Sequence, residues 1–296
     1  MQSIYDVPAP AKLNLFLHIT GRRADGYHLL QSVFMLIDWC DTLHFERRTD
    51  GLITREDLTT ALPADDLVLR AARALQQAAQ CPLGAHIGVA KSIPAQAGMG
   101  GGSSDAASTL LALNRLWNLN WSVEQLSQVG VRLGADVPFF LCGQHAWVEG
   151  IGEAITPIAL PRAQFVVAKP EQGLATQEIF SHPKLKRDTE TATIAGFAAN
   201  AFDKIWGFGR NDLQAVAQTL CPGVNQALVW LATKGLQGRM TGSGSAVFAR
   251  CTHDVDIGDA PDALQVRLCS NLDAHPLLGW AVSEGLSVGG VNRQPV

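Results

Sequence analysis

Residues 94–105 read Pro94-Ala95-Gln96-Ala97-Gly98-Met99-Gly100-Gly101-Gly102-Ser103-Ser104-Asp105, and this stretch is the strongest local signal in the 296-residue chain. Four glycines in five positions remove side chains and leave backbone N–H groups free to approach an anion. We expect an alanine-rich helix over 103–117, with Ser103 and Ser104 as its N-terminal caps. The helix dipole and the unpaired N–H groups at that end favour negative charge. The stretch therefore predicts a cradle for a polyphosphate, and a side chain at Gly101 is expected to obstruct the phosphates without disturbing the fold.

The common phosphate-binding motifs do not match this stretch. The dinucleotide-binding fingerprint requires Gly at position 103, where this chain has Ser. The P-loop requires a Gly-Lys dipeptide, which occurs nowhere in the sequence. The protein-kinase sequences His-Arg-Asp and Asp-Phe-Gly are also absent. The cradle therefore points to a different class of nucleotide-binding protein.

Composition excludes several classes of protein. Apolar residues make up 47% of the chain and charged residues 17%, so a sizeable core can form. Lys plus Arg number 23 against 27 Asp plus Glu, and the net charge of -4 argues against a nucleic-acid partner. The six cysteines include no Cys-x-x-Cys pair, so neither a zinc cluster nor a redox dithiol is expected. Without a recognisable secretory signal or bilayer-spanning run, we expect a cytoplasmic protein with no membrane partner. The sequence leaves the oligomeric state open.

Hydrophobic periodicity predicts an α+β fold. Residues 11–20 alternate as in a strand, so that Lys12, Asn14, Phe16 and His18 face away from the leucines. Further strands are expected over 28–37, 42–46, 85–91 and 164–168, on either side of a glycine turn within 239–251, and over 278–282. Helices are expected over 66–80 and 103–117, from a capping box at Ser122, near 176, 194, 211 and 224, and over 261–271. Strands and helices mix without a strict βαβ rhythm, which favours α+β over a doubly wound sheet.

Three motifs together resemble those of the GHMP kinases, which are named for galactokinase, homoserine kinase, mevalonate kinase and phosphomevalonate kinase. The first is the glycine-rich stretch itself, which is similar to their ATP loop. The others are Pro10-Ala11-Lys12-Leu13-Asn14 and Thr241-Gly242-Ser243-Gly244-Ser245. The resemblance implies an ATP-dependent small-molecule kinase that works with Mg²⁺. It also implies a domain like ribosomal protein S5 domain 2 over 1–155 and a ferredoxin-like domain over 156–296.

Other segments resemble one branch of these kinases, whose substrate carries a cytidine diphosphate moiety. They are Arg23-Ala24-Asp25-Gly26-Tyr27-His28, Gly134-Ala135-Asp136-Val137-Pro138-Phe139-Phe140, Glu149-Gly150-Ile151-Gly152-Glu153 and Asn211-Asp212-Leu213. This resemblance implies transfer of phosphate to the 2-hydroxyl of a sugar alcohol in non-mevalonate isoprenoid precursor synthesis. One alternative is a GHMP kinase of homoserine or mevalonate type. Another is a non-enzymatic RNA-binding module, because the first domain resembles a ribosomal protein.

Two residues stand out as candidates for the chemical step. Lys12 shares a strand face with Asn14, roughly 6–7 Å away, and that face must meet something polar. Asp136 precedes an apolar run, where a carboxylate is costly unless it is paired. The ordinary alternative for Asp136 is a helix N-cap ahead of Pro138. The resemblance implies that Asp136 is the catalytic base, that Lys12 stands beside it, and that Asn14 contacts the reacting end of the substrate.

The remaining ligand contacts come from the resemblance. It implies that Tyr27 and His28 bind the cytosine, that Thr176-x-x-x-Phe180 closes its other side, and that Gly242, Ser243 and Gly244 also contact substrate. ATP would be held by residues 94–104 and, near the adenine, by Asp66, where the family usually has Asn. Gln96 stands where the family usually has Gly. No protein ligand for Mg²⁺ can be assigned, and Ser104 is the one candidate.

Overall fold

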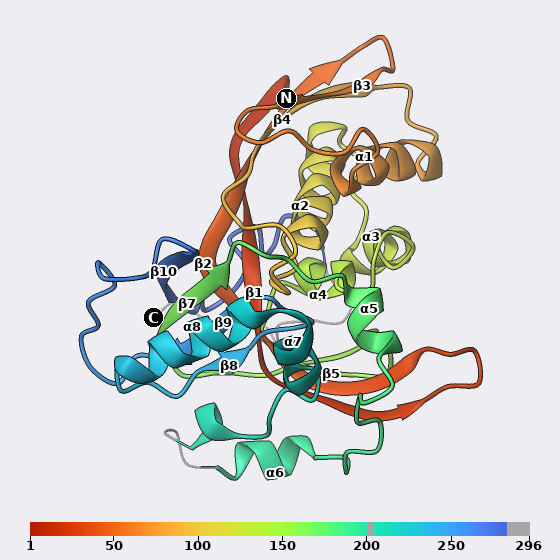
Figure 1. The fold of residues 1–296 in the computed structure, drawn as a ribbon. Coiled ribbons are helices and arrows are strands. Elements are labelled where there is room, and N and C mark those ends of the chain that lie inside the picture. Colours follow the sequence, from red (N-terminus) through yellow and green to blue (C-terminus); the bar gives the residue numbers. More distant parts are fainter. Residues whose placement is uncertain (201–203, 283–296) are drawn as a thin grey trace, which may run out of the picture.

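The computed structural model describes residues 1–200 and 204–282, and its helices surround two β-sheets (Figure 1). The strands are β1 (Ser3–Arg22), β2 (His28–Arg48), β3 (Ile53–Asp57), β4 (Gly84–Ala90), β5 (Ala146–Glu149), β6 (Ala154–Pro157), β7 (Gln164–Pro170), β8 (Arg239–Met240), β9 (Val247–Arg250) and β10 (Leu264–Ser270). The helices are α1 (Leu67–Ala78), α2 (Gly101–Leu116), α3 (Val123–Gly130), α4 (Val137–Cys142), α5 (Thr176–Ser181), α6 (Ile194–Ala198), α7 (Gln214–Leu220) and α8 (Pro222–Thr233), with a 3-10 turn η1 (Ile205–Gly207). The mixture confirms the α+β expectation, and the strands expected at 28–37 and 42–46 are one continuous strand, β2.

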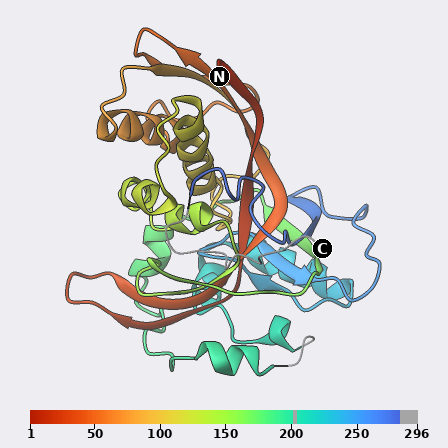
Figure 2. The ribbon, with the colours of Figure 1, turned by 180° about the vertical axis from the view of Figure 1, so that it is seen from behind.

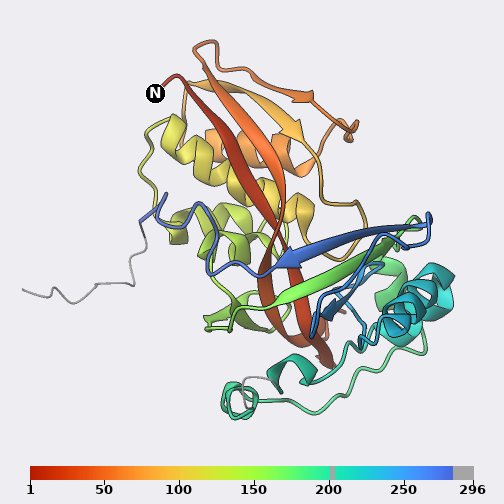
Figure 3. The same ribbon diagram turned by 90° about the vertical axis from the view of Figure 1, so that its left-hand side faces the viewer.

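Two long strands, β1 and β2, run through both halves of the molecule (Figure 3). They pair antiparallel along their whole length, from Ser3 opposite Glu46 to Arg22 opposite His28. The other edge of β2 pairs with β4 towards one end and with β5 towards the other. The first sheet therefore has the order β3-β4-β2-β5-β6, with β1 beside β2. Because β1 reaches both halves, residues of one strand can contribute to a site between them.

Helices α1 to α4 cover one face of the first sheet, as the view from behind also shows (Figure 2). Helix α2 packs against both β1 and β2, and its small residues Ala106 and Ala107 are fully buried there. Small side chains let the helix approach the strands closely, while Leu110 and Leu113 fill the space beside them. Full burial of a leucine side chain contributes about 1.5–3 kcal/mol. This packing holds the start of α2 in a defined position relative to β1.

The second sheet is antiparallel, in the order β10-β7-β9-β8, and α7 and α8 pack against it. Leu17 and Ile19 of β1 belong to the same hydrophobic cluster as these helices. Leu17 also forms a β-bridge with Asn211, directly before α7. The far half of β1 is therefore part of the core of the second half of the molecule.

Phe16 does not follow the alternation that the sequence predicts. The pairing of β1 with β2 shifts between Asn14 and Leu17, where a β-bulge changes which face each residue presents. Phe16 consequently packs in the same buried cluster as Leu13, although it was expected on the opposite face. Lys12 and Asn14 precede the bulge, so they keep their shared face as predicted.

Two expectations for the C-terminal segment are wrong. Residues 261–271 contain the strand β10 instead of a helix, because this segment pairs with β7 along its whole length and tertiary pairing overrides local propensity. Residues 278–282 form turns instead of a strand, with the N–H of Trp280 donating to the carbonyl of Leu277 (3.0 Å). Leu277 and Ala281 pack into the core beneath the first sheet. The domain boundary at 155/156 stays a prediction.

Candidate active site

Helix α2 begins directly after a glycine in the left-handed conformation. Gly100 is the N-cap residue with a φ of 72°, which glycine adopts without the steric cost of a Cβ. The helix starts at Gly101, so Ser103 and Ser104 lie inside its first turn, and the expectation that they cap it is wrong. The N–H of Ser104 donates to the carbonyl of Gly100 at 2.9 Å, whereas the N–H groups of residues 101–103 have no partner within the helix and are available to an anion.

The glycine loop is joined by its backbone to the glycine turn at 241–245. The N–H of Ser245 donates to the carbonyl of Gln96 at 3.0 Å. A Cβ on Gly98 would lie 2.8 Å from the backbone nitrogen of Gly244 and closer still to the carbonyl oxygen of Thr241. Both segments therefore need glycine to approach one another, and two motifs far apart in sequence form one structural unit.

Gln96 occupies a position where its backbone is left-handed, with a φ of 52°. This conformation costs a residue with a Cβ roughly 1–2 kcal/mol, which is a physical reason for the family's usual glycine. The side chain of Gln96 lies against Gly173, where an added Cβ would come within 2.7 Å of the Gln96 Cβ. Gly173 therefore makes room for the residue that replaces glycine in the loop.

Gly101 faces the interior of the protein. A Cβ there would lie 3.1 Å from Ile93 Cγ2 and 3.6 Å from Asp41 Oδ2. A larger side chain at this position would press on buried packing, and the expectation that it leaves the fold undisturbed stays a prediction.

Lys12 and Asp136 converge beside the glycine loop. The Nζ of Lys12 lies 3.9 Å from Oδ2 of Asp136, 4.7 Å from the ring centroid of Phe34, and donates a hydrogen bond to Asn14 Oδ1. A Cβ on Gly100 would lie 3.3 Å from Lys12 Cγ, so the helix start is adjacent. Burial lowers the pKa of Lys12, and the charge of Asp136 acts in the opposite direction. The site thus places a lysine side chain next to both a carboxylate and the start of α2.

Asp136 stands at the N-cap position of α4, as the ordinary alternative predicts, yet its side chain makes no capping hydrogen bond. Pro138 in the first turn has no N–H to offer. The Asp136 side chain is 31% exposed, whereas that of Lys12 is 4% exposed. The carboxylate is therefore held by the fold but open to a ligand on one side.

Asn14 links this pair to the second half of the molecule. Its backbone N–H donates to Thr241 Oγ1 at 2.9 Å, and its side-chain Nδ2 donates to Ser32 Oγ at 2.9 Å. Ser32 in turn donates to the carbonyl of Phe16. Sequence reasoning missed Ser32 and the role of Thr241. A serine within the apolar run of β2 was the available signal, because a buried hydroxyl needs a partner.

The residues expected at the cytosine lie around the β1–β2 hairpin and α5. The rings of His28 and Phe180 are 5.1 Å apart, and Tyr27 beside them is 61% exposed. Burial lowers the pKa of His28, and the nearby positive charges of Arg187 and Arg22 lower it further. The aromatic faces are therefore gathered where a flat base can stack.

Helix α5 also touches the glycine turn. Oγ1 of Thr176 lies 2.8 Å from Oγ of Ser243, and either hydroxyl can be the donor. The structure thus brings together Thr176 and the turn at 242–244, which the sequence assigned to the same ligand. Phe180 lies on the same short helix, which connects the expected base contacts to the rest of the site.

Asp66 caps α1 and forms an ion pair with Arg55, whose side chain lies between the start of this helix and Asp57. Its Oδ1 accepts from the N–H of Leu69 at 3.1 Å and lies 2.6 Å from Nη1 of Arg55. Arg55 also pairs with Asp57, with Nε 2.7 Å from Oδ1. The start of α1 adjoins the glycine loop, since a Cβ on Gly102 would lie 3.3 Å from the side chain of Leu67. The carboxylate that was expected near the adenine is therefore already engaged within the protein.

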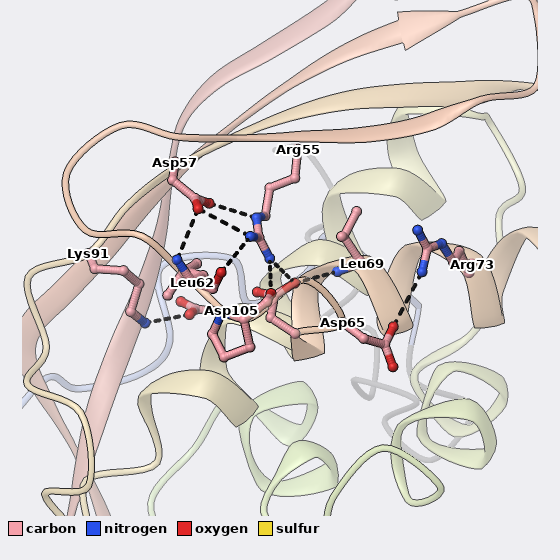
Figure 4. Close-up of polar contacts among 10 residues, drawn as sticks. Arg55, Asp57, Leu62, Asp65, Leu69, Arg73, Lys91 and Asp105 are labelled. Atoms are coloured by element: carbon pink, nitrogen blue, oxygen red, sulfur yellow. Dashed lines mark hydrogen bonds and ion pairs between the residues drawn. The ribbon is translucent and has the colours of Figure 1, made fainter.

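Sequence reasoning missed a buried charge cluster behind the loop. Lys91 bridges Asp41 and Asp105, and Figure 4 shows its ammonium group directed at Asp105. Asp41 also accepts the backbone N–H of Ile93 at 2.8 Å. Burial raises the pKa of Asp105 to about 7, although Lys91 opposes the shift. Because Lys91 directly follows β4 and Asp105 lies in α2, the cluster joins the segments on either side of the glycines.

Neither a metal cluster nor a membrane span is evident in the described part of the chain. Within residues 1–200 and 204–282, no group of three or more His, Cys, Asp or Glu side chains could hold a metal ion. Over the same residues, no helix is long and apolar enough to cross a bilayer. The hydroxyl of Ser104, the one candidate ligand for Mg²⁺, is fully buried and has no hydrogen-bond partner there.

Two family models match the chain. The model of the GHMP kinases N terminal domain matches residues 66–144, and that of the GHMP kinases C terminal matches residues 195–270. A relative from Albidiferax ferrireducens, 4-diphosphocytidyl-2-C-methyl-D-erythritol kinase, is 71% identical over 289 residues, which cover 98% of this chain and 99% of the relative.

Solved structures agree with these matches. A crystal structure of 4-(cytidine 5'-diphospho)-2C-methyl-D-erythritol kinase has a TM-score of 0.74 and 30% identity, and the match covers 91% of this chain and 98% of that one. Homoserine kinase from Cytophaga hutchinsonii has a TM-score of 0.70 with 15% identity, covering 93% of this chain and 96% of the other. The second likeness shows the fold alone.

Proposed function

This chain belongs to the 4-diphosphocytidyl-2-C-methyl-D-erythritol kinases within the GHMP kinases, and we propose that it transfers the γ-phosphate of ATP to the 2-hydroxyl of 4-diphosphocytidyl-2-C-methyl-D-erythritol. It is a small-molecule kinase of the two-domain GHMP fold. The observation that carries the reaction type is the Lys12–Asp136 pair, 3.9 Å apart, beside the N-terminus of α2. The products are ADP and the 2-phosphate.

Asp136 is the proposed general base. Phosphoryl transfer needs a group that accepts the proton of the attacking hydroxyl, and a positioned carboxylate serves this purpose. The exposed side of Asp136 supports this role, because its carboxylate is not used by a helix cap. The positive charge of Lys12, 3.9 Å from the Asp136 carboxylate, offsets the negative charge that develops on the transferring group. Asn14 holds the Lys12 ammonium in place and is proposed to contact the reacting end of the substrate.

The glycine loop supplies the proposed ATP site. Residues 94–104 would surround the triphosphate with backbone N–H groups, and the positive end of the α2 dipole would face it. Mg²⁺ supplies charge neutralisation to a bound triphosphate, and such ions are held largely by phosphate oxygens and water. The Ser104 hydroxyl is enclosed, and among the described residues no group of three or more His, Cys, Asp or Glu side chains could hold this ion.

The cytidine diphosphate moiety is proposed to lie between Tyr27 and Phe180, next to His28. The 5.1 Å separation of the His28 and Phe180 rings supports a stacking site at this place. The proposed remaining contacts are Thr176 and the turn of Gly242, Ser243 and Gly244, which the structure joins through the Thr176–Ser243 hydroxyl contact. We further propose that the enzyme acts in the cytoplasm, in isoprenoid precursor synthesis, without a nucleic-acid or membrane partner.

A coupled ADP-release assay tests the proposed function. The protein is supplied with ATP and, in parallel, with the diphosphocytidyl substrate, homoserine or mevalonate. Turnover with the diphosphocytidyl substrate alone is expected. Turnover with homoserine or mevalonate instead would replace the proposal by another GHMP kinase activity. RNA retention on filters without ATP turnover would favour the binding-module alternative.

A further inference from the structure

Arg187 is tied to the expected base-binding site through four hydrogen bonds. Its Nη1 donates to the carbonyl of Leu185 (3.0 Å), and its Nη2 donates to the carbonyls of Phe180 (3.1 Å) and His182 (3.0 Å). Its Nε donates to Nε2 of His28 at 3.0 Å. The guanidinium is therefore held in one orientation by three backbone oxygens, with its Nε–H directed at the imidazole.

The bond from Arg187 determines which nitrogen of His28 carries the proton. Arg has no acceptor atom and does not deprotonate in proteins, so Nε2 of His28 must be the acceptor. A neutral imidazole has one protonated nitrogen, and the proton must then reside on Nδ1. The positive charge of Arg187 lowers the pKa of His28 further than burial alone, which favours the neutral ring. The other ring nitrogen of His28, Nδ1, therefore carries the hydrogen and is a donor.

We propose that Arg187 is a positioning residue that fixes the Nδ1–H tautomer of His28 and thereby selects cytosine over uracil. The inference rests on the proposed function, because it assumes that a pyrimidine binds beside His28. Position 3 of cytosine is a hydrogen-bond acceptor, whereas position 3 of uracil carries an N–H donor. An N–H donor on His28 can bond to the acceptor at position 3 of cytosine. With uracil, the same donor would face the N–H donor at position 3, and neither would have a partner. Unpaired buried donors are costly enough to weaken uracil binding by about tenfold or more.

Three variants separate this role from a purely structural one. Arg187→Met replaces the arginine by a side chain of similar length without hydrogen-bond donors, so His28 can adopt the Nε2–H tautomer. Arg187→Lys keeps a donor-only cation and should retain the Nδ1–H form. Arg22→Met is the matched control, since Arg22 also carries positive charge near His28 but bonds to the carbonyl of Gly26 at 3.1 Å.

Two measurements are made on the whole protein. Imidazole ¹⁵N NMR of the free protein at pH 8 reports the tautomer of His28. Calorimetric titration with cytidine 5'-diphosphate and uridine 5'-diphosphate reports the ratio of their dissociation constants. In the wild type we expect the Nδ1–H form and at least about tenfold tighter binding of the cytidine ligand. Arg187→Met should lose both properties, whereas Arg187→Lys and Arg22→Met should keep them.

The outcomes distinguish this inference from the function on which it rests. An Nε2–H tautomer in the wild type would overturn the role of Arg187, even if Arg187→Met proves unable to fold. An unchanged binding ratio in folded Arg187→Met, with cytidine diphosphate still bound, would overturn base selection by Arg187 while leaving the kinase activity intact. Failure of the wild type to bind cytidine diphosphate would refute the substrate assignment and the base selection together.

Discussion

The Nζ of Lys12 lies 3.9 Å from Oδ2 of Asp136, and the two side chains come from a long strand and from the residue before a short helix. Lys12 is buried and Asp136 is partly open, so the carboxylate is the more accessible member of the pair.

Asp136→Asn should fold and bind both ligands but lose about 10²–10⁴-fold in the chemical step, because the proton acceptor is gone. Lys12→Ala should also cut turnover, and the double variant should be little worse than the worse single one, since the two groups act as a unit. Single-turnover kinetics at saturating ligand isolates the step. Asp6→Asn is the control, because the side chain of Asp6 is 87% exposed and its replacement should leave the chemical step unchanged. Near-normal chemistry in Asp136→Asn would show that positioning and charge stabilisation suffice without a base.

Tyr27→Ala and Phe180→Ala should each weaken binding of the diphosphocytidyl substrate by about 1–3 kcal/mol, because each removes an aromatic face from a stacked base. ATP affinity should change little, since neither residue lies in the glycine loop. Calorimetric titration with each ligand checks the difference. Equal losses for ATP and substrate would contradict the assignment of this region to the cytosine.

Asp66→Asn should hold or improve ATP affinity. Asn is as good an N-cap as Asp, so the bond to the Leu69 N–H can persist. The variant loses the ion pair with Arg55, but that cation keeps its pairing with Asp57. The dissociation constant for ATP, measured by calorimetry, is the readout. A large loss of ATP affinity would mean that Asp66 does not stand where the family has its Asn near the adenine.

Gly98→Ala should destabilise the protein by more than about 2 kcal/mol and weaken ATP binding. Its φ of 71° is strained for any residue with a Cβ, and the new methyl group would collide with the backbone of the turn at 241–245. Thermal unfolding and ATP titration measure the two effects. Gly207→Ala is the matched control, because an added Cβ there meets nothing within 4 Å. Equal behaviour of the two variants would mean that the loop and turn are not held together as described.

Stability should fall as the pH drops from 6.5 towards 4, partly because of His275. Burial lowers the pKa of His275 to about 4, whereas the unfolded side chain takes up a proton near 6.5. Between these values the unfolded state binds more protons, so the free energy of unfolding decreases as pH falls, by ~2 kcal/mol at pH 5 from this residue.

His275→Asn isolates this contribution. Nδ1 of His275 accepts a hydrogen bond from the N–H of Leu277 at 3.0 Å. An Asn side chain can accept the same bond from the backbone two residues further along the chain. Urea unfolding at pH 7 and pH 5 should show a smaller difference in the variant than in the wild type. His253→Asn, at an exposed site, should leave the difference unchanged. An identical pH response in His275→Asn and wild type would refute the neutral buried state of His275.

The sequence by itself determined the features that depend on local pattern. The spacing of glycines in 94–105 indicated a phosphate loop, and the capping box at Ser122 predicted the start of α3. Alternation in 11–20 placed Lys12 and Asn14 on one face of a strand. These three predictions succeed because backbone freedom, helix capping and two-residue periodicity depend only on residues that are close together in the sequence.

Tertiary structure alone decided the features that depend on residues far apart in the chain. Residues 264–270 became a strand because β7 offered its free edge, and a bulge in β1 turned Phe16 towards the leucines. The contact of Thr241 with Asn14 spans more than two hundred positions, and that of Arg187 with His28 spans 159. A hydrogen bond requires its two atoms to be within about 3 Å, and only the packed chain brings such distant residues to that separation.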